Sequence, residues 1–411
     1  MIPGGNGNYR SAVESTGLDS QIRFESSRQT VRSIRLEKHM ALDVSSVPDQ
    51  IREWLQRAIE AGASDLHLIV GYPPVLRVHG DLTELPEPTL NGDESESLLH
   101  DLCPIELRAQ LHTQKNVDFS FSLIVNGRVQ RFRANLFHSG KRLGACLRVV
   151  PGKIPELAWA EFPPALAQQL ARLRDGLVIV TGATGSGKTT TLAMIVNLLN
   201  KAGGYRIITV EEPVEYKFPR AANSVVTQRE VGADVLSFAD GLKYGLRQDP
   251  DVILVGEIRD RETAQMALSA AETGHLVFTS LHTRDAKGAI SRYADLFPQD
   301  VQKDIRVQLA LSLRAIVSQR LLPAVQGGAK RHLALEVLIN TYPIASAIRL
   351  GKLESIDNYL ITNRNDGMLS MDESVRQLLR AGKITRATAE QNVRDPTLLG
   401  SGLPQEGSGV F

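Results

Sequence analysis

The 411-residue chain lacks several features that mark common classes of protein. It holds two cysteines, Cys103 and Cys146, without any CxxC pair, so it cannot build a four-cysteine zinc site. Two scattered thiols are typical of a protein in a reducing cytosol. The 47 basic and 46 acidic residues leave a formal net charge of +1, so no basic excess indicates a nucleic-acid or anionic-membrane partner.

Long apolar runs are missing as well. No stretch approaches the roughly 20 apolar residues that cross a bilayer, and the polar N-terminus has no signal-peptide core. We therefore expect a cytoplasmic protein that reaches a membrane only through a partner. Residues 1–46 are rich in Ser, Gly, Asn and Arg with weak periodicity, which predicts a disordered extension.

Residues 47–150 predict a small α+β domain. Apolar positions spaced three and four apart near residues 51–59 predict a helix, and a second helix is expected near residues 92–111. Strand-like segments lie at residues 65–70, 75–79, 117–125, 130–137 and 145–150. The pair Asn126 and Gly127 is a strong signal for a hairpin turn between two of these strands.

A different pattern follows. Residues 151–170 contain four prolines before residue 165 and predict a linker. Short, continuous apolar strands then alternate with helical stretches, which predicts a parallel sheet covered on both faces. These strands are expected at residues 176–180, 206–210, 252–255 and 275–279. We therefore predict an α/β domain over residues 171–393 and a flexible tail over residues 394–411.

The loop after the first of these strands carries a phosphate-binding motif. Residues 182–189 read GATGSGKT, which fits the pattern GxxxxGK[ST] in full, and a helix is expected at residues 190–200. Backbone N–H groups of such a loop, together with a helix N-terminus, favour bound phosphate. Lys188 would meet the β- and γ-phosphates of ATP, and the Thr189 hydroxyl would ligate Mg²⁺. The residues predicted to bind ATP are Gly182, Ala183, Thr184, Gly185, Ser186, Gly187, Lys188, Thr189 and Thr190.

Carboxylates and histidines follow three of the other strands. Glu257 comes just after residues 252–255 and is the candidate second ligand of Mg²⁺, because parallel strands end at one edge of a sheet. The segment TVEEPVE, residues 209–215, could orient and deprotonate a water, or it could be a charged loop. His275 and His282 bracket another strand and could either bond a phosphate or be structural.

These elements, in this order, resemble the superfamily of secretion and pilus-retraction ATPases, over about residues 47–393. The matching stretches are GATGSGKT at 182–189, VEEPVE at 210–215, VTQREVG at 226–232, LRQDPD at 246–251, DVILVGEIRD at 251–260, AETGH at 271–275, LHT at 281–283 and ASDLH at 63–67. The resemblance implies a PAS-like N-terminal domain and a RecA-like P-loop NTPase domain. It also implies a homohexameric ring with ATP at the subunit boundaries.

By motif position, the resemblance assigns roles to four side chains. Glu215 would be the general base and Glu257 the carboxylate that follows the Walker B strand. Arg133 and Arg148 would be the arginines of the N-terminal domain that reach the γ-phosphate. Arg131 shares a strand face with Arg133, so a shift of two residues in the alignment remains open.

The two-cysteine content favours one branch of the superfamily. Pilus-assembly and type II secretion ATPases usually carry a four-cysteine zinc element, so this chain resembles the retraction motors of twitching motility. Its box at residues 211–213 reads EEP where the family usually has EDP. Residues 343–350, PIASAIRL, depart from the C-terminal motif of the principal retraction motors. The surrounding stretches, EVLIN at 336–340 and IRLGK at 348–352, resemble the accessory paralogue more.

The resemblance implies partners and leaves alternatives open. Expected partners are other copies of the chain, a paralogous motor within a mixed assembly and a platform protein of the inner membrane, with no nucleic acid. One alternative is the motor of a conjugation or type IVB secretion system, and another is a RecA-like nucleic-acid translocase. A third is a non-hydrolysing ring subunit, against which Lys188, Glu215 and Glu257 argue.

Overall fold

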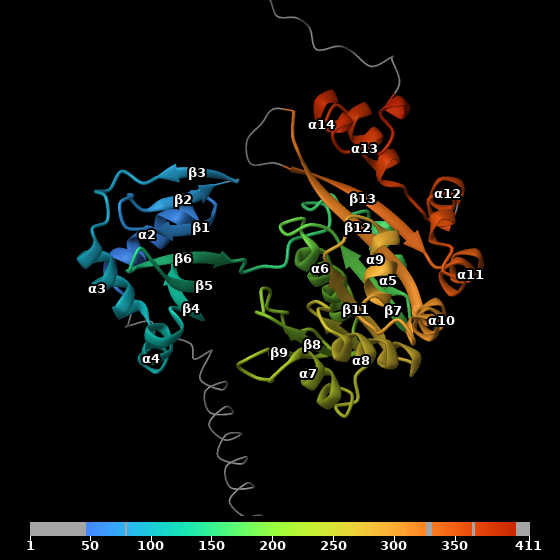
Figure 1. Cartoon of the computed structure of the whole chain (residues 1–411), viewed down its shortest axis with the longest axis horizontal. Coiled ribbons are helices and arrows are strands. Elements are labelled where there is room, and N and C mark those ends of the chain that lie inside the picture. Colours follow the sequence, from blue (N-terminus) through green and yellow to red (C-terminus); the bar gives the residue numbers. More distant parts are fainter. Residues whose placement is uncertain (1–46, 79, 326–330, 364–365, 400–411) are drawn as a thin grey trace, which may run out of the picture.

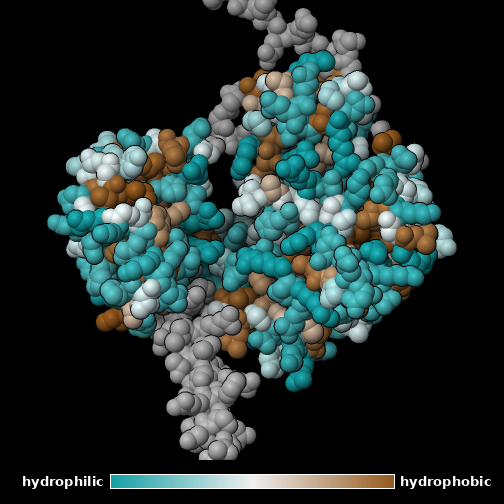
Figure 2. Space-filling view, in the orientation of Figure 1, coloured by the Kyte–Doolittle hydropathy of each residue, from teal (hydrophilic) through white to brown (hydrophobic). Residues whose placement is uncertain are grey.

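The computed structural model describes residues 47–78, 80–325, 331–363 and 366–399, and these form two domains (Figure 1). The smaller domain lies on the left of the view and the larger on the right. In the space-filling view the domains are separate lobes that meet in the middle, and apolar side chains are scattered over a mostly hydrophilic face (Figure 2). The predicted extension, residues 1–46, lies outside the described residues.

The smaller domain is built on a six-stranded antiparallel sheet in the order β3-β2-β1-β6-β5-β4. The strands are β1 (Ala63–Leu68), β2 (Val75–Val78), β3 (Asp81–Glu84), β4 (Asn116–Val125), β5 (Arg128–Ser139) and β6 (Arg142–Val150). The helices are α2 (Asp49–Glu60), α3 (Gly92–Leu102) and α4 (Ile105–Gln114). Side chains of β4 alternate between buried and more exposed positions, so one face of the sheet packs on a core.

Local chemistry explains the details of this domain. Asn126 and Gly127 both have positive φ, 51° and 72°, as the predicted hairpin turn requires. The single helix predicted over residues 92–111 is instead two helices, because Pro104 has no N–H with which to continue α3 and stands as the N-cap of α4. Strand β3 was not predicted, since all four of its residues are exposed and leave no apolar pattern.

The larger domain is built on a seven-stranded sheet in the order β13-β12-β7-β11-β10-β8-β9. Its strands are β7 (Gly176–Thr181), β8 (Arg206–Glu211), β9 (Val225–Glu230), β10 (Val252–Val255), β11 (Leu276–Leu281), β12 (Leu313–Pro323) and β13 (Arg331–Ile339). All neighbours are parallel except β12 and β13. The predicted fold class is confirmed: an α/β domain around a P-loop, preceded by a smaller α+β domain.

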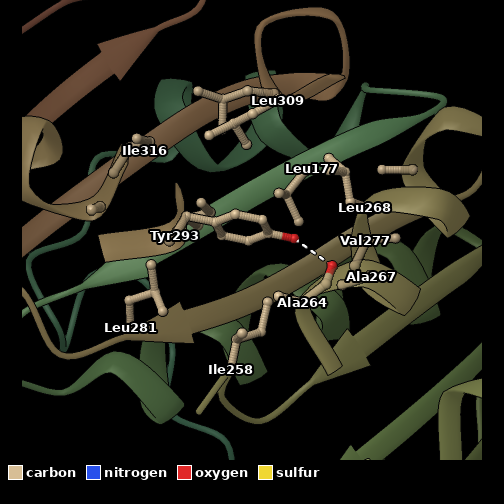
Figure 3. Packing of buried hydrophobic residues seen from close by; sticks show 14 of the residues in the cluster. Leu177, Ile258, Ala264, Ala267, Leu268, Val277, Leu281, Tyr293, Leu309 and Ile316 are labelled. Carbon is tan, nitrogen blue, oxygen red and sulfur yellow. Dashed lines mark hydrogen bonds between the residues drawn. The ribbon is translucent and has the colours of Figure 1, made fainter. Parts of the chain in front are cut away.

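Helices cover both faces of this sheet, and two core clusters lie beneath them. The helices are α5 (Pro164–Ala171), α6 (Lys188–Ala202), α7 (Phe238–Gly245), α8 (Arg261–Glu272), α9 (Ala286–Ala294), α10 (Gln302–Ser312), α11 (Tyr342–Leu350), α12 (Ile356–Thr362), α13 (Met371–Arg380) and α14 (Arg386–Glu390). Tyr293 of α9 is fully buried, and its hydroxyl donates to the Ala264 carbonyl oxygen at 2.7 Å (Figure 3). This bond matters because an unpaired buried hydroxyl costs about 1–3 kcal/mol.

The second half of the predicted linker belongs to the larger domain. Within residues 151–170, helix α5 buries Leu166, Ala167 and Leu170 in the core cluster that α6 also lines. Two of the prolines that predicted the linker instead begin this helix. Pro163 is the N-cap of α5 and a proline follows in its first turn, where a helix tolerates proline because that N–H has no intrahelical partner.

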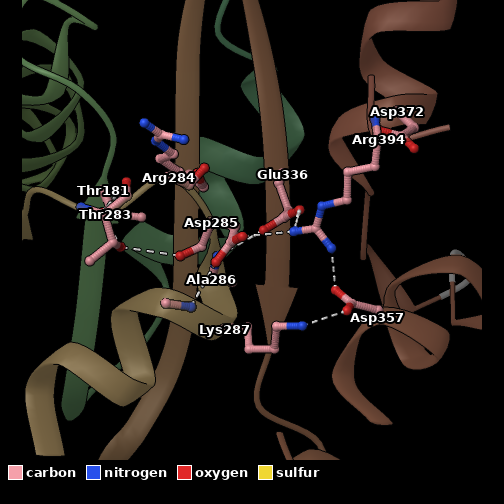
Figure 4. Close-up of polar contacts among 12 residues, drawn as sticks. Thr181, Thr283, Arg284, Asp285, Ala286, Lys287, Glu336, Asp357, Asp372 and Arg394 are labelled. Atoms are coloured by element: carbon pink, nitrogen blue, oxygen red, sulfur yellow. Dashed lines mark hydrogen bonds and ion pairs between the residues drawn. The ribbon is translucent and has the colours of Figure 1, made fainter. Parts of the chain in front are cut away.

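The end of the described chain is fastened by an ion cluster (Figure 4). Arg394 pairs with Asp357 at 2.5 Å and Asp285 at 2.9 Å, and its guanidinium lies 3.7 Å from Glu336. Lys287 pairs with Asp357 from the other side at 2.8 Å. Burial raises the pKa of Glu336, and the nearby charge of Arg394 counteracts that shift.

The predicted flexible tail therefore begins too early. Within residues 394–411, Arg394 is paired, residues Pro396–Leu399 form a short 3-10 helix and Leu399 is buried. The Gly/Ser/Pro composition hid this packing because a single arginine and a single leucine leave no periodic signal. Residues 400–411 lie outside the described residues.

Candidate active site

The phosphate-binding loop lies between β7 and α6, at the carboxyl edge of the parallel strands. Gly182, Gly185 and Gly187 have φ values of 150°, 77° and 87°, which residues other than glycine rarely adopt. At Gly182 an added Cβ would stand 2.4 Å from the Gln319 carbonyl oxygen. The loop therefore has the glycine-dependent path that the motif predicts, and α6 starts directly behind it.

Lys188 folds back over this loop. Its Nζ donates to the carbonyl oxygens of Gly182 at 3.0 Å and Ala183 at 3.1 Å. Burial lowers the pKa of Lys188, while the charges of Glu257 and Glu215 counteract the shift. The ammonium is thus held at the phosphate loop, where a positive charge can meet phosphate oxygens, and the nearby carboxylates help to keep it protonated.

His282, just after β11, connects Lys188 to Glu257. Its Nδ1 lies 3.4 Å from Lys188 Nζ, and its Nε2 lies 2.9 Å from a Glu257 oxygen. An ammonium group only donates, so Nδ1 must accept, and Nε2 carries the proton that is donated to Glu257. The structure therefore brings together three predicted residues from three separate motifs.

Glu257 also pairs with Arg259, which in turn reaches Glu212 at 2.7 Å. Burial alone favours the protonated carboxyl, but the hydrogen bonds and charges of Arg259 and His282 outweigh it and lower the pKa of Glu257. This carboxylate stays ionised at neutral pH, as a group that faces a divalent cation should.

Glu215 lies in the acidic loop, residues 211–218, which follows β8. Burial raises the pKa of its carboxyl, although the charge of Arg148, a hydrogen bond from Thr189 and the charges of Arg133 and Lys188 counteract the rise. Glu215 therefore stands beside the first turn of α6. A carboxylate with a raised pKa, bonded to a residue next to the phosphate loop, suits proton abstraction from a water.

The other two acidic residues of this loop have different surroundings. Glu211 is buried and accepts hydrogen bonds from Thr209 and Gln228 at 2.6 and 3.2 Å, so its role is structural. Glu212 pairs with Arg259 at the surface. Of the alternatives open for this loop, a catalytic role is therefore a prediction for Glu215, whereas Glu211 and Glu212 have partners within the loop's surroundings.

Arg133 and Arg148 stand directly opposite each other on β5 and β6. Arg148 donates to the buried Asp65 at 2.8 Å, while Arg133 makes a 3.5 Å contact with Asp118. Both lie close enough to Glu215 for their charges to lower its pKa. The structure therefore brings the predicted arginines of the small domain to the Glu215 side of the phosphate site within one chain.

His275 is not brought to this site within one chain. It precedes β11, at the amino edge of the sheet, where its Nδ1 lies 3.0 Å from the Ala270 carbonyl oxygen and 3.2 Å from the Thr273 hydroxyl. The six residues of β11 place it about 20 Å from the phosphate loop at roughly 3.3 Å per residue. The sequence motif joins His275 and His282, but the strand separates them.

Thr189 and Glu257 are the predicted ligands of Mg²⁺, and their oxygens are the hard donors that this ion prefers. Among the described residues, no group of three or more His, Cys, Asp or Glu could hold a metal ion. A cation here would need phosphate oxygens and water to complete its shell, which is how nucleotide sites usually bind magnesium. The donors present therefore fit a nucleotide-bound magnesium.

Sequence reasoning missed three contributors to this region and named a fourth, Arg131, only as an alternative to Arg133. Arg259 stands two residues after Glu257, and Gln228, Glu230 and Arg131 contact the acidic loop. Arg259, Gln228 and Glu230 lie in stretches that match the family motifs, but only the contacts in three dimensions show what the four residues hold. In the described part of the chain no helix is long and apolar enough to cross a membrane.

The family model for type II/IV secretion system proteins matches residues 40–392. The chain belongs to this family. It is similar to the type IV pilus retraction ATPase PilT of Pseudomonas aeruginosa, with 39% identity over 349 residues, or 84% of this chain and 98% of the relative. PilU of the same organism, named a type IV pilus ATPase, is 35% identical, with 82% and 86% covered.

A solved structure supports the same placement. The crystal structure of the pilus retraction motor PilT with bound ADP superposes with a TM-score of 0.74 at 42% identity, covering 84% of this chain and 98% of that one. This chain is a nucleotide-binding member of the family of secretion and pilus ATPases, and its phosphate loop is the element that would hold the nucleotide.

Proposed function

We propose that this protein hydrolyses ATP and uses the energy to retract type IV pili. The arrangement of Lys188, His282 and Glu257 around the phosphate loop, with Glu215 beside Thr189, carries the proposal. Similarity to pilus retraction ATPases over most of the chain supports the coupling to pili. The near-neutral net charge gives no support to nucleic acid as the moving substrate.

Each residue has a task in this reaction. Backbone N–H groups of the phosphate loop and Lys188 hold the β- and γ-phosphates, and Thr189 and Glu257 would hold Mg²⁺. When bound there, the cation would supply charge neutralisation on the phosphate oxygens. Glu215 removes a proton from the attacking water, while Arg148 and Arg133 stabilise charge on the γ-phosphoryl group as it transfers.

We further propose that the active form is a homohexameric ring. It would act on a platform protein at the cytoplasmic side of the inner membrane and could include a paralogous motor. The identity is 39% with PilT and 35% with PilU, so overall identity gives no support to the accessory branch expected from residues 336–340 and 348–352. We therefore place the chain among retraction motors without assigning it to the accessory branch.

The decisive experiment is deletion of the gene with complementation. Cells without it should stay piliated but fail to retract their pili in a twitching assay. The wild-type gene should restore motility, and a Lys188→Ala gene should not. Loss of pili, or loss of secretion or DNA transfer with normal twitching, would direct the assignment to an assembly, secretion or conjugation motor instead.

The ring is tested with the purified protein. Arg148→Lys should lower turnover sharply with the small domain still folded, because lysine lacks the planar fork of the guanidinium. Specific activity should also fall on dilution as rings dissociate. Full turnover of an Arg133→Lys, Arg148→Lys double variant, together with concentration-independent activity, would leave a monomeric ATPase.

A further inference from the structure

The acidic loop is fixed at both sides of Glu215 by edge strand β9. Glu230 accepts a hydrogen bond from the Val214 N–H at 3.0 Å. Gln228 donates to the Tyr216 carbonyl oxygen at 2.7 Å and accepts from the Phe218 N–H at 3.0 Å. These bonds hold the residues that flank Glu215, so they determine where its carboxylate points.

A bond to α6 adds a third point of attachment. The Tyr216 hydroxyl lies 2.8 Å from the Thr190 hydroxyl, and the tyrosine ring is buried. Thr190 follows the magnesium-ligand candidate Thr189 in the chain. The loop is therefore registered against the phosphate-binding helix as well as against β9.

The fourth attachment comes from the smaller domain. The two terminal nitrogens of Arg131 on β5 donate to the Val214 carbonyl oxygen at 2.5 Å and to Glu230 at 3.3 Å. The Val214 residue is thus held by its N–H and its C=O at once. The side chain of Glu230 is only 9% exposed, so its negative charge depends on the neighbouring guanidinium for compensation.

We propose that Arg131 and Glu230 form an interdomain clasp that places Glu215 for catalysis. When the small domain docks, Arg131 completes the attachment of Val214, and when the domain moves away Val214 and Glu230 lose the guanidinium that binds both of them. Arg131 is then a positioning residue, distinct from Arg133 and Arg148 on the phosphate side. The role assigned to Glu215 comes from the proposed function, on which this inference rests.

The geometry separates Arg131 from its neighbour on the strand. Arg133 is two residues away on the same face, but its hydrogen-bond partner is Asp118 of its own domain. A lysine at position 131 could not donate from two separated nitrogens to a carbonyl and a carboxylate. The clasp therefore requires arginine at this position, and a two-residue shift of register would lose it.

The test uses the full-length protein with Arg131→Gln, Arg131→Lys, Glu230→Gln and the Arg131→Gln, Glu230→Gln double variant. Arg142→Gln is the matched control, because Arg142 begins β6 of the same sheet and pairs at the surface with Asp93. The measurements are kcat and KM for ATP, thermal stability and hydrogen exchange of residues 211–218.

We expect the clasp variants to lose about tenfold or more in kcat with KM within about twofold, since a displaced catalytic group impairs the chemical step more than binding. Exchange of the acidic loop should become faster while that of α6 stays unchanged. The double variant should lose no more than the more affected single variant, because both substitutions break one clasp.

Two results would overturn the clasp. One is Arg131→Gln turnover equal to that of Arg142→Gln, and the other is unchanged exchange of residues 211–218 in Arg131→Gln. If the parent protein itself does not hydrolyse ATP, the proposed function fails. In that case hydrogen exchange alone tests the clasp. Faster exchange of Arg131→Gln that is confined to residues 211–218 would show that the clasp exists but has no catalytic role.

Discussion

The seven-stranded sheet presents histidines at both of its edges, in different surroundings. At the carboxyl edge His282 joins Lys188 to Glu257 beside the phosphate loop. At the amino edge His275 bonds the Ala270 carbonyl oxygen and Thr273 of the preceding turn. Both belong to the stretch that matches one family motif, and β11 alone separates them. The sequence motif therefore identifies the strand, but only its carboxyl end lies beside the phosphate loop, where a side chain can take part in the reaction.

The largest expected effect belongs to the carboxyl edge. Lys188→Ala should abolish hydrolysis, because the β- and γ-phosphates lose their cationic partner, while the fold persists. ATP turnover and circular dichroism of the purified variant check this. Hydrolysis at the parent rate would show that the phosphate loop is not the catalytic centre. The carboxyl edge of the sheet would then have no advantage over the amino edge.

Two carboxylates at the same edge should differ from each other. Glu215→Gln should slow turnover by about 10²–10⁴-fold and leave ATP and Mg²⁺ binding nearly intact, as expected for a general base. Glu257→Gln should also shift the Mg²⁺ concentration needed for half-maximal turnover. Magnesium titrations of both variants measure this, and equal, mild effects would remove both assignments.

The histidine pair tests the comparison directly. His282→Ala should lower turnover by about tenfold, because Lys188 and Glu257 lose their link. His275→Ala should leave turnover close to the parent value and cost about 0.5–1.5 kcal/mol of stability from the lost hydrogen bond. Steady-state kinetics and thermal melts separate the two. A turnover defect as large in His275→Ala would mean that the amino edge reaches a nucleotide on a neighbouring subunit.

The smallest effect is a displacement in pH. The base must be deprotonated, and burial raises the pKa of Glu215, so kcat should fall on the acid side at a pH above the ordinary range of a glutamate carboxyl. Arg148→Gln removes a charge that lowers this pKa, so the acid limb should move to higher pH while kcat decreases. Rate profiles at fixed ionic strength test the sign, and a shift to lower pH would contradict it.

Features with a local cause could be predicted from the sequence. The phosphate loop depends on glycines and a following helix, the four central strands are continuous apolar runs, and the hairpin at Asn126 needs only two residues of positive φ. Strand β9 could not be predicted in this way, because this edge strand reads VVTQRE and uses Gln228 and Glu230 to hold a loop. The contacts of Arg131 depend on how the two domains pack together, and the spacing of apolar residues in the sequence does not predict that packing.

The ion cluster around Arg394 can form only late in the synthesis of the chain. Asp285, Glu336 and Asp357 are all translated before their shared arginine. A nascent chain that has already completed every residue of the phosphate site still carries a buried Glu336 that lacks this cation. The ATPase domain can therefore reach its final charge balance only when residue 394 has left the ribosome, and a chain shortened just before it would keep the catalytic residues but leave Glu336 without this cation.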